Sequence, residues 1–194
     1  MTCTSPTYLY DLSMYVPCGK CTACKIAHSR EWSVRLLHEM SYFEDSAFVT
    51  LTYDDDHLPS PASLDKRELQ LFFKRLRKAY DKPIKYFASG EYGDKNARPH
   101  YHAILLGFAD PNSYICPKSN IRRSPFLERV WQSKGMCHYG TVTYDSCRYV
   151  CDYTFKKYTE KYNKKVYGDL LPPFQLSSQG MGLRYAEANS AQLS

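Results

Sequence analysis

The residues best suited to chemistry are two histidines separated by a single residue. His100 and His102 stand at the head of the apolar run 103–106, and alternate residues of a β-strand point to the same face. Glu91 lies nine residues before His100, at the end of the strand-like run 84–88, and turn-forming residues lie between. A hairpin would therefore bring a carboxylate beside two imidazoles, which suits a divalent metal with positions open for substrate. The alternative is a pair of surface histidines on an ordinary strand.

A second set of reactive side chains lies on the helix predicted at residues 146–162. At roughly 100° per residue, one side of this helix is apolar and can pack on a sheet, whereas Tyr149, Tyr153 and Lys156 fall together on the opposite side. A tyrosine oxygen can attack a phosphodiester and hold the cut strand as a phosphotyrosine ester, and a nearby lysine can stabilise the developing charge. The alternative is an amphipathic helix whose outer face is aromatic and basic.

Cysteines near the N-terminus have the spacing of metal ligands. Cys18, Cys21 and Cys24 are three residues apart, and His28 follows Cys24 by four. Neighbouring thiolates at this spacing can share one ion, and either His28 or Cys3 would complete a tetrahedral structural zinc site. Reduced thiols without metal and an iron–sulfur cluster are the alternatives, although the usual fourth Cys followed by Pro is absent. A zinc ion here would pin the N-terminal arm.

Composition limits the class of protein that these residues serve. The chain has 194 residues, 43% of them hydrophobic, which is enough for one good-sized domain with a core. The absence of an 18-residue apolar run or a leader-like start predicts a soluble, non-secreted protein, and the eight scattered cysteines predict a reducing compartment. The net charge of +6 is compatible with nucleic acid, and the 18 tyrosines either stack on unpaired bases or fill half-buried sheet positions.

These residues need a scaffold, which hydrophobic periodicity predicts to contain both helices and strands. Helical spacing predicts helices at 29–43, 65–80, 124–134 and 146–162. Runs rich in β-branched and aromatic residues predict strands at 47–53, 84–88, 103–106 and 138–144. The segments 1–17, 110–123 and 167–194 are predicted to be irregular.

The helix predicted at 65–80 is capped at its start and strongly basic beyond its apolar stripe. Asp65 with Glu68 fits a capping box. The basic residues either contact a phosphate backbone or form a solvated face. The candidate DNA contacts among them are Lys74, Arg75, Arg77 and Lys78.

Three segments of the chain occur in an order that resembles a known family. FVTLTY (48–53), RPHYHAIL (98–105) and YVCDYTFKK (149–157) follow the motif order of HUH endonucleases, named for two histidines that flank a hydrophobic residue. More closely, the chain resembles the replication initiator proteins of small single-stranded DNA phages, the microviruses of the gokushovirus type. The resemblance covers about residues 17–184 and extends to PCGKCTAC, SREW, TLTYDDDHLP, FFKRLRK and GEYGDKNARPHYHA.

The resemblance implies a fold and a division of the chain. The fold is α+β, an HUH endonuclease domain of the RRM-like or ferredoxin-like kind, with a central antiparallel sheet of about five strands flanked by helices. The metal would lie on the sheet and the tyrosines on a facing helix. The implied divisions are an N-terminal arm (1–28), the endonuclease domain (29–166) and an irregular C-terminal tail (167–194) that packs on the same domain.

The resemblance also implies a reaction, the nicking and rejoining of single-stranded origin DNA in rolling-circle replication. Glu91, His100 and His102 match the ligands of a Mg²⁺ or Mn²⁺ ion that polarises the scissile phosphate. The expected partners are the single-stranded origin and the host replication polymerase and helicase, in the cytoplasm of the bacterial host and without a membrane.

The tyrosines match the pair found in the phage initiators. One of Tyr149 and Tyr153 would cut the origin, keep the 5′ phosphate and free a 3′ hydroxyl, and the other would cut after a round of synthesis. Lys156 matches the lysine that follows the pair, and Arg98 and Lys157 complete the candidate DNA contacts.

Two other functions use the same residues differently. A non-enzymatic single-stranded nucleic-acid-binding module would use the aromatic residues and the basic helix, and would leave the histidine pair and the twin tyrosines as coincidences. A water-using metal-dependent nuclease would need the metal ligands and no tyrosine.

Overall fold

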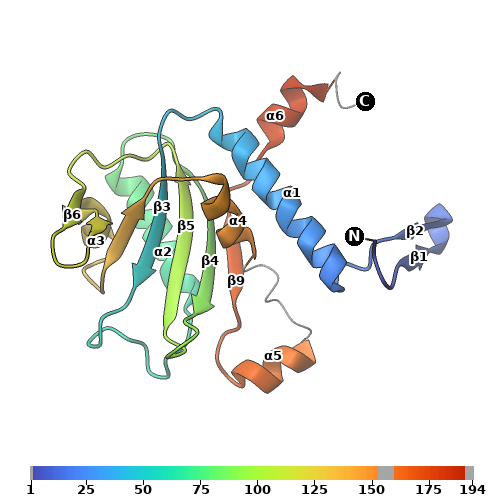
Figure 1. Cartoon of the computed structure of the whole chain (residues 1–194), viewed down its shortest axis with the longest axis horizontal. Helices are drawn as coiled ribbons and strands as arrows, with labels where there is room; N and C mark the ends of the chain where they lie inside the picture. Colours follow the sequence, from blue (N-terminus) through green and yellow to red (C-terminus); the bar gives the residue numbers. More distant parts are fainter. Residues whose placement is uncertain (1, 153–159, 191–194) are drawn as a thin grey trace.

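The centre of the structure is an antiparallel sheet (Figure 1). The computed structural model describes residues 2–152 and 160–190. Across the sheet, seven strands of these ranges follow the order β6-β7-β8-β3-β5-β4-β9. The predicted α+β class with a central antiparallel sheet is confirmed, and the sheet is larger than the five strands expected. The strands are β3 (Ser46–Thr52), β4 (Lys85–Tyr92), β5 (Pro99–Leu106), β6 (Tyr114–Cys116), β7 (Ile121–Arg123), β8 (Cys137–Gly140) and β9 (Phe174–Ser177).

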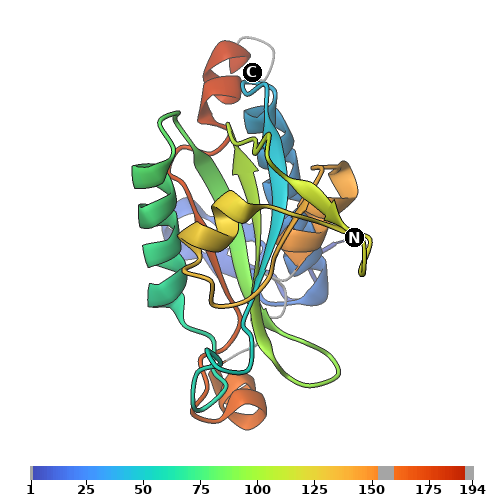
Figure 2. The ribbon, with the colours of Figure 1, turned by 90° about the vertical axis from the view of Figure 1, so that its left-hand side faces the viewer.

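Helices cover both faces of the sheet. Figure 2 shows α2 (green) on one side of the strands, and α1 (blue) with α4 (orange) on the other. None of the helices in the described ranges is both long and apolar enough to cross a membrane. The helices are α1 (Thr22–Met40), α2 (Lys66–Ala79), α3 (Pro125–Val130), α4 (Tyr144–Asp152), α5 (Glu160–Tyr167) and α6 (Leu183–Ala188).

One hydrophobic core lies between the sheet and α2. Successive strand residues point to opposite faces, so Val49, Leu51 and Tyr101 join this core while the residues between them belong to the other face. α2 contributes an apolar stripe at helical spacing, which confirms the helix predicted at 65–80. All members of the stripe are buried: Leu69, Phe72, Phe73 and Leu76.

The predicted cap of α2 is confirmed in part. The Asp65 carboxylate accepts a hydrogen bond from the Glu68 backbone N–H at 3.0 Å. The Glu68 carboxylate does not complete the capping box, because it accepts from Arg75 at 2.7 Å and from Lys134 at 2.8 Å. Glu68 therefore connects α2 to the segment after α3 instead of closing its own helix end.

A second core lies on the opposite face, where α1 and α4 pack. Leu36 of α1 and Val150 and Cys151 of α4 are fully buried against Phe87 and Ile104 of the sheet. The buried side of α4 is therefore the side that its helical spacing predicts.

The first long helix begins earlier than residue 29. α1 starts at Thr22, with Cys21 as its N-cap, because the residues from 22 to 28 include no Gly or Pro to interrupt it. Ser29 is buried inside the helix and donates to the Asp152 carboxylate of α4 at 2.8 Å, so it joins two helices and is not a cap.

Short strands and helices occupy segments that were predicted to be irregular. Within 1–17, β1 (Thr7–Leu9) and β2 (Met14–Val16) form a hairpin around a 3₁₀ turn, and 110–123 contains β6 and β7. Within 167–194, β9 pairs with β4 and α6 follows. These strands have three or four residues each, too few for a pattern of alternation to stand out in sequence.

The segment before α4 also differs from the prediction. The strand expected at 138–144 ends at Gly140, because Thr143 and Ser146 cap a helix that begins at Tyr144. Ser146 N–H donates to Thr143 Oγ1 at 3.1 Å, and Thr143 N–H donates to Ser146 Oγ at 2.7 Å. Of the helix predicted at 146–162, residues 153–159 lie outside the described ranges.

A buried carboxylate ties α1 to the sheet and to the C-terminal segment. Glu39 is fully buried, and its Oε1 accepts from the Lys85 ammonium of β4 at 2.6 Å. Its Oε2 accepts from the Gly182 N–H at 2.7 Å, directly before α6. Both carboxylate oxygens are thus used, and three distant parts of the chain meet at one side chain.

We expect Glu39→Gln to lower the free energy of unfolding by about 3 kcal/mol, because an amide NH₂ cannot accept and leaves either Lys85 or Gly182 without its acceptor. Urea unfolding measures the loss. Glu31→Gln is the matched control on the same helix. Its exposed pair with Arg35 contributes less than about 0.5 kcal/mol, so equal losses in the two variants would contradict the role given to Glu39.

Candidate active site

A cluster of polar side chains interrupts the sheet face that α1 and α4 cover. β4 and β5 pair so that Glu91 lies opposite His100 and Ser89 lies opposite His102. Residues opposite each other in an antiparallel pair project to the same face. The hairpin predicted from the turn residues is present, and it brings the carboxylate beside both imidazoles.

Both histidines converge on one oxygen atom. Glu91 Oε1 lies 2.9 Å from His100 Nε2 and 2.6 Å from His102 Nε2. One ligand atom from each of the three residues lies within 4.8 Å of the other two. Glu91 is only 2% exposed, and among the described residues its Oε2 has no hydrogen-bond partner. A buried carboxylate with an unsatisfied oxygen is costly unless a cation approaches it.

The remaining ring nitrogens are held by outer partners. His100 Nδ1 lies 3.1 Å from the Arg98 carbonyl oxygen, which can only accept, so this nitrogen carries the hydrogen. His102 Nδ1 lies 2.9 Å from Thr50 Oγ1, a hydroxyl that can also accept. This arrangement turns the Nε2 lone pairs toward the Glu91 oxygen, and acceptors that face one another need a proton or a metal ion between them. The residues therefore fit a divalent metal.

The local electrostatics support the same ligand set. Burial lowers the pKa of His102 and favours the neutral imidazole, the form that coordinates metals. Burial acts to raise the pKa of Glu91, but the hydrogen bonds and charges of His100 and His102 together outweigh it and leave that pKa below its usual value. The cluster thus offers imidazole nitrogen and carboxylate oxygen, donors that bind Mn²⁺ and related ions.

α4 brings Tyr149 to this cluster. The Tyr149 hydroxyl lies 3.5 Å from His102 Nε2, and the two rings meet edge to face with centroids 5.1 Å apart. The tyrosine is 42% exposed. Its hydroxyl is thus beside the candidate metal ligands while its ring stays accessible from solvent.

The position of Tyr149 differs from the prediction that it lies opposite the packed side of its helix. The apolar side of α4 packs against α1 and the part of the sheet around Phe87 and Ile104. Tyr149 consequently lies at the margin of the packed side, and its long side chain reaches sideways over the strands to His102. A helical projection gives the angle about the axis and not the position of that axis over the sheet.

Three of the predicted site residues, Tyr153, Lys156 and Lys157, lie outside the described residues. The neighbouring Asp152 is described, and its carboxylate accepts from Ser29 of α1 and pairs with Arg148 at 3.6 Å. Asp152 is therefore directed to α1.

The basic residues of α2 lie on the other face of the sheet from the histidines. Arg75 is used internally, because it donates to the Val130 carbonyl at 2.9 Å and to the Glu68 carboxylate. Arg77 donates to Ser178 and lies over the Tyr86 ring. Lys74 and Lys78 are exposed. The structure therefore does not bring these four residues together with the candidate active site.

Arg98 lies at the histidine end of the sheet. It pairs with the Asp55 carboxylate at 2.6 Å and donates to the Tyr53 carbonyl at 3.0 Å. A pocket of about 420 Å³ opens beside it and is lined by His100, Thr52, Pro99 and the turn between β4 and β5. Arg98 is thus the predicted DNA contact that the structure brings next to the site.

The N-terminal cysteines gather around a different fourth residue from the one expected first. Cys18, Cys21 and Cys24 lie with Cys3, and the four sulfur atoms are within 4.8 Å of one another. His28 Nε2 instead accepts from the Trp32 indole at 3.1 Å. One turn of α1 carries His28 past the cysteine cluster, and the chain before β1 supplies the fourth sulfur.

Thr50 is the site residue that sequence reasoning missed. It alternates with the buried Val49 and Leu51 in FVTLTY, a pattern that places it on the opposite face. Its pairing opposite His102 depends on the register between β3 and β5, which are about 50 residues apart. Alternation could have singled out Thr50, but not its partner.

Comparison with known proteins gives the chain a family. The model of the family described as replication-associated protein ORF2 matches residues 46–158, more than half of the chain, and this segment includes Glu91, His100, His102 and Tyr149. No solved structure matches the chain significantly.

Curated relatives carry similar names. The chain is 36% identical over 157 residues to replication-associated protein VP4 of Bdellovibrio phage phiMH2K, covering 75% of this chain and 49% of that protein. It is 36% identical over 197 residues to replication-associated protein ORF2 of Spiroplasma virus 4, covering 95% and 61%. It is 32% identical over 166 residues to replication-associated protein ORF4 of Chlamydia phage 1, covering 76% and 40%. The chain thus spans about half the length of these relatives. From the family match over the segment that carries the candidate active site, the chain belongs to the replication-associated protein ORF2 family.

Proposed function

We propose that this chain is the nicking and joining endonuclease of a rolling-circle replication initiator that acts on single-stranded phage origin DNA. One observation carries the proposal: the Tyr149 hydroxyl lies 3.5 Å from the His102 nitrogen that, with His100, converges on Glu91. A nucleophile beside a metal-ligand set is the arrangement that phosphodiester chemistry requires. Membership of a family of replication-associated proteins supports the same biological role.

Three residues would hold the cofactor. Glu91, His100 and His102 are the ligands that we assign to Mg²⁺ or Mn²⁺. A bound ion would polarise the scissile phosphate and make its phosphorus a better electrophile. Thr50 and the Arg98 carbonyl orient the two imidazoles through Nδ1 and keep Nε2 directed to the site.

The reaction exchanges one phosphate ester for another. The Tyr149 oxygen attacks phosphorus, and the bond from phosphorus to the 3′ oxygen breaks. The phenolic proton passes to a base, and the departing 3′ oxygen takes up a proton as a free hydroxyl. The 5′ phosphate stays on the tyrosine, so a later attack by a 3′ hydroxyl rejoins the DNA without another energy source.

A second tyrosine completes the proposal. Tyr153 follows Tyr149 by four residues, and two nucleophiles allow the cut that starts replication and the cut that ends it to alternate. Lys156 is the residue that we assign to stabilise the charge on the transferring phosphate, and Lys157 is assigned to backbone contact.

The substrate strand would pass the end of the sheet that carries His100. The pocket of about 420 Å³ next to His100 is open to solvent and bordered by Arg98 and Lys95, so one nucleotide can lie beside the ligand set with its phosphate near positive charge. We propose the cytoplasm of the bacterial host as the place of action, with the host polymerase and helicase as replication partners.

We expect Glu91→Gln to weaken Mn²⁺ binding by roughly 10- to 100-fold or more, because the amide keeps the shape of the side chain and removes its charge. Isothermal titration calorimetry on the full chain measures the change. Asp94→Asn is the control, since Asp94 is an exposed acid of the adjoining turn. The ligand assignment fails if Glu91→Gln binds Mn²⁺ as tightly as the unmodified chain.

We expect Tyr149→Phe to reduce formation of the protein–DNA adduct on the order of 10³-fold or more, because the variant lacks the attacking oxygen and keeps the ring. The assay incubates single-stranded oligonucleotides that cover candidate origins with Mn²⁺ and detects the heavier band on a denaturing protein gel. Tyr144→Phe, an exposed tyrosine at the start of the same helix, is the control and retains the adduct.

The double variant Tyr149→Phe with Tyr153→Phe separates the proposed enzyme from other functions. We expect it to bind DNA and to form no adduct. Cleavage that survives the double change would point to attack by water, and an unmodified chain that binds strands without cutting any candidate origin would point to a binding module.

A further inference from the structure

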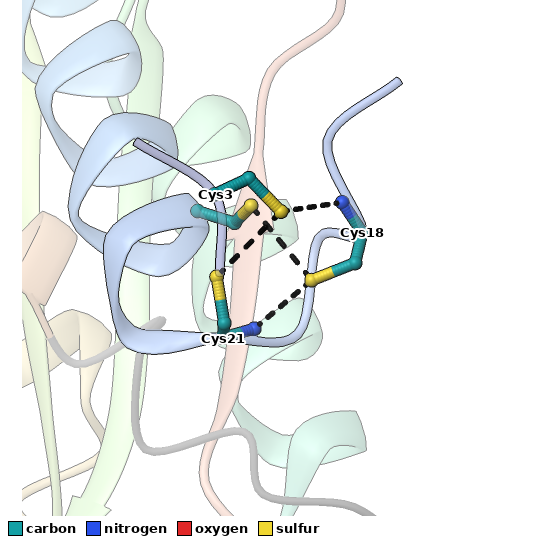
Figure 3. A group of neighbouring side chains, drawn as sticks. Cys3, Cys18 and Cys21 are labelled. Atoms are coloured by element: carbon teal, nitrogen blue, oxygen red, sulfur yellow. Dashed lines mark hydrogen bonds between the residues drawn. The ribbon is translucent and has the colours of Figure 1, made fainter. Parts of the chain in front are cut away.

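The four N-terminal cysteines form a compact sulfur cluster. Figure 3 shows Cys3, Cys18 and Cys21 turned toward one another at the start of α1. The sulfur of Cys18 lies 3.9 Å from that of Cys24, and the sulfur of Cys21 lies 3.9 Å from that of Cys3. Segments before β1, after β2 and at the start of α1 thus contribute to one centre.

The separations of the sulfur atoms fit one metal ion. A tetrahedral zinc ion with Zn–S distances of about 2.3 Å holds its sulfurs about 3.8 Å apart, close to the two observed separations of 3.9 Å. A disulfide needs its sulfurs at about 2.05 Å. A cubane cluster needs room for several irons between the thiolates. The geometry therefore favours a single ion over either alternative.

The backbone around the cluster favours the thiolate form. The N–H groups of Lys20 and Cys21 both donate to Cys18 Sγ at 3.4 Å, and the Cys18 N–H donates to Cys3 Sγ at 3.4 Å. Gly19 makes this turn possible, since its φ of +69° is a conformation that other residues rarely adopt. Cys21 and Cys24 lie in the first turn of α1, where the unpaired N–H groups of a helix stabilise negative sulfur.

The hairpin between Cys3 and Cys18 has no core of its own. The strands β1 and β2 carry no buried residue, and Tyr10 and Tyr15 are 85% and 69% exposed. Figure 1 shows the hairpin standing out beside the start of α1, away from the sheet. An isolated two-stranded hairpin is marginally stable in water, so its fixed position needs another source of stability.

We propose that Cys3, Cys18, Cys21 and Cys24 bind one structural Zn²⁺ ion that fixes both ends of the β1–β2 hairpin to the start of α1. Cys3 precedes β1 and Cys18 follows β2, so a single ion closes the hairpin at its base. His28 is not a ligand, because its Nε2 is occupied by the Trp32 indole. The site is separate from the proposed nicking site and uses sulfur donors, which select zinc over Mg²⁺ or Mn²⁺.

Metal content and cobalt spectroscopy on the full chain test the ligand set. We expect roughly one zinc ion per chain by elemental analysis, and after exchange with Co²⁺ the charge-transfer and visible bands of a tetrahedral tetrathiolate site. Cys3→Ser should weaken Co²⁺ binding by at least about 100-fold, since loss of an outer partner alone costs up to that much. His28→Ala and Cys116→Ser are the controls and should leave the spectrum unchanged.

Limited proteolysis tests the structural role. Chymotrypsin should cut the hairpin at Tyr10 or Tyr15 at least about tenfold faster after zinc is removed by a chelator, and equally fast in Cys3→Ser with or without zinc. Circular dichroism should show the helices and the sheet unchanged, because no residue of the two cores belongs to the hairpin.

Several results would overturn the proposal. These are no bound metal after incubation of the reduced chain with Zn²⁺ or Co²⁺, loss of the cobalt spectrum in His28→Ala, iron with acid-labile sulfide in place of zinc, or a disulfide between cluster cysteines in protein purified under reducing conditions. None of these measurements uses DNA, so their failure leaves the proposed nicking activity unaffected.

Discussion

The register between β4 and β5 is the constraint on which the candidate active site depends. In an antiparallel pair, a slip of one residue moves every side chain of a strand to the other face. Glu91 meets His100 and His102 only because Glu91 lies opposite His100. The same register places Ala88 opposite Ala103 in one core and Phe87 opposite Ile104 in the other. Apolar packing on both faces therefore holds the polar ligands in position.

The two faces of the sheet divide stability from chemistry. The face under α2 is a continuous hydrophobic core, whereas the face under α1 and α4 is apolar at one end and polar at the other. Burial of Glu91 is tolerable at the polar end because two imidazoles surround it. Tyr149 reaches this end because α4 is anchored by its buried side and by the bond from Ser29 to Asp152. The helix that supplies the hydroxyl is thus held by α1 as well as by the sheet.

The chain contains two ligand clusters of different chemical character. Glu91, His100 and His102 offer a carboxylate and imidazoles on a rigid sheet, which suits ions that keep positions open for a substrate. The four cysteines offer only sulfur, from loops and a helix end, which suits an ion closed off by protein. The first cluster rests on packed strands, whereas the second would provide the stability of a hairpin that buries no apolar residue.

Sequence alone determined the features that depend on neighbouring residues. The period of two along a strand placed His100 and His102 on one face, the turn residues predicted the hairpin to Glu91, and Asp65 marked the start of α2. Only the tertiary structure decided which distant segments meet. It brought Thr50 to His102, replaced His28 by Cys3, moved Tyr149 from the outside of its helix to the edge of the sheet, and added β9 from the tail. The physical reason is that alternation and helical spacing specify directions around a local axis, whereas the positions of the axes follow from packing over the whole core.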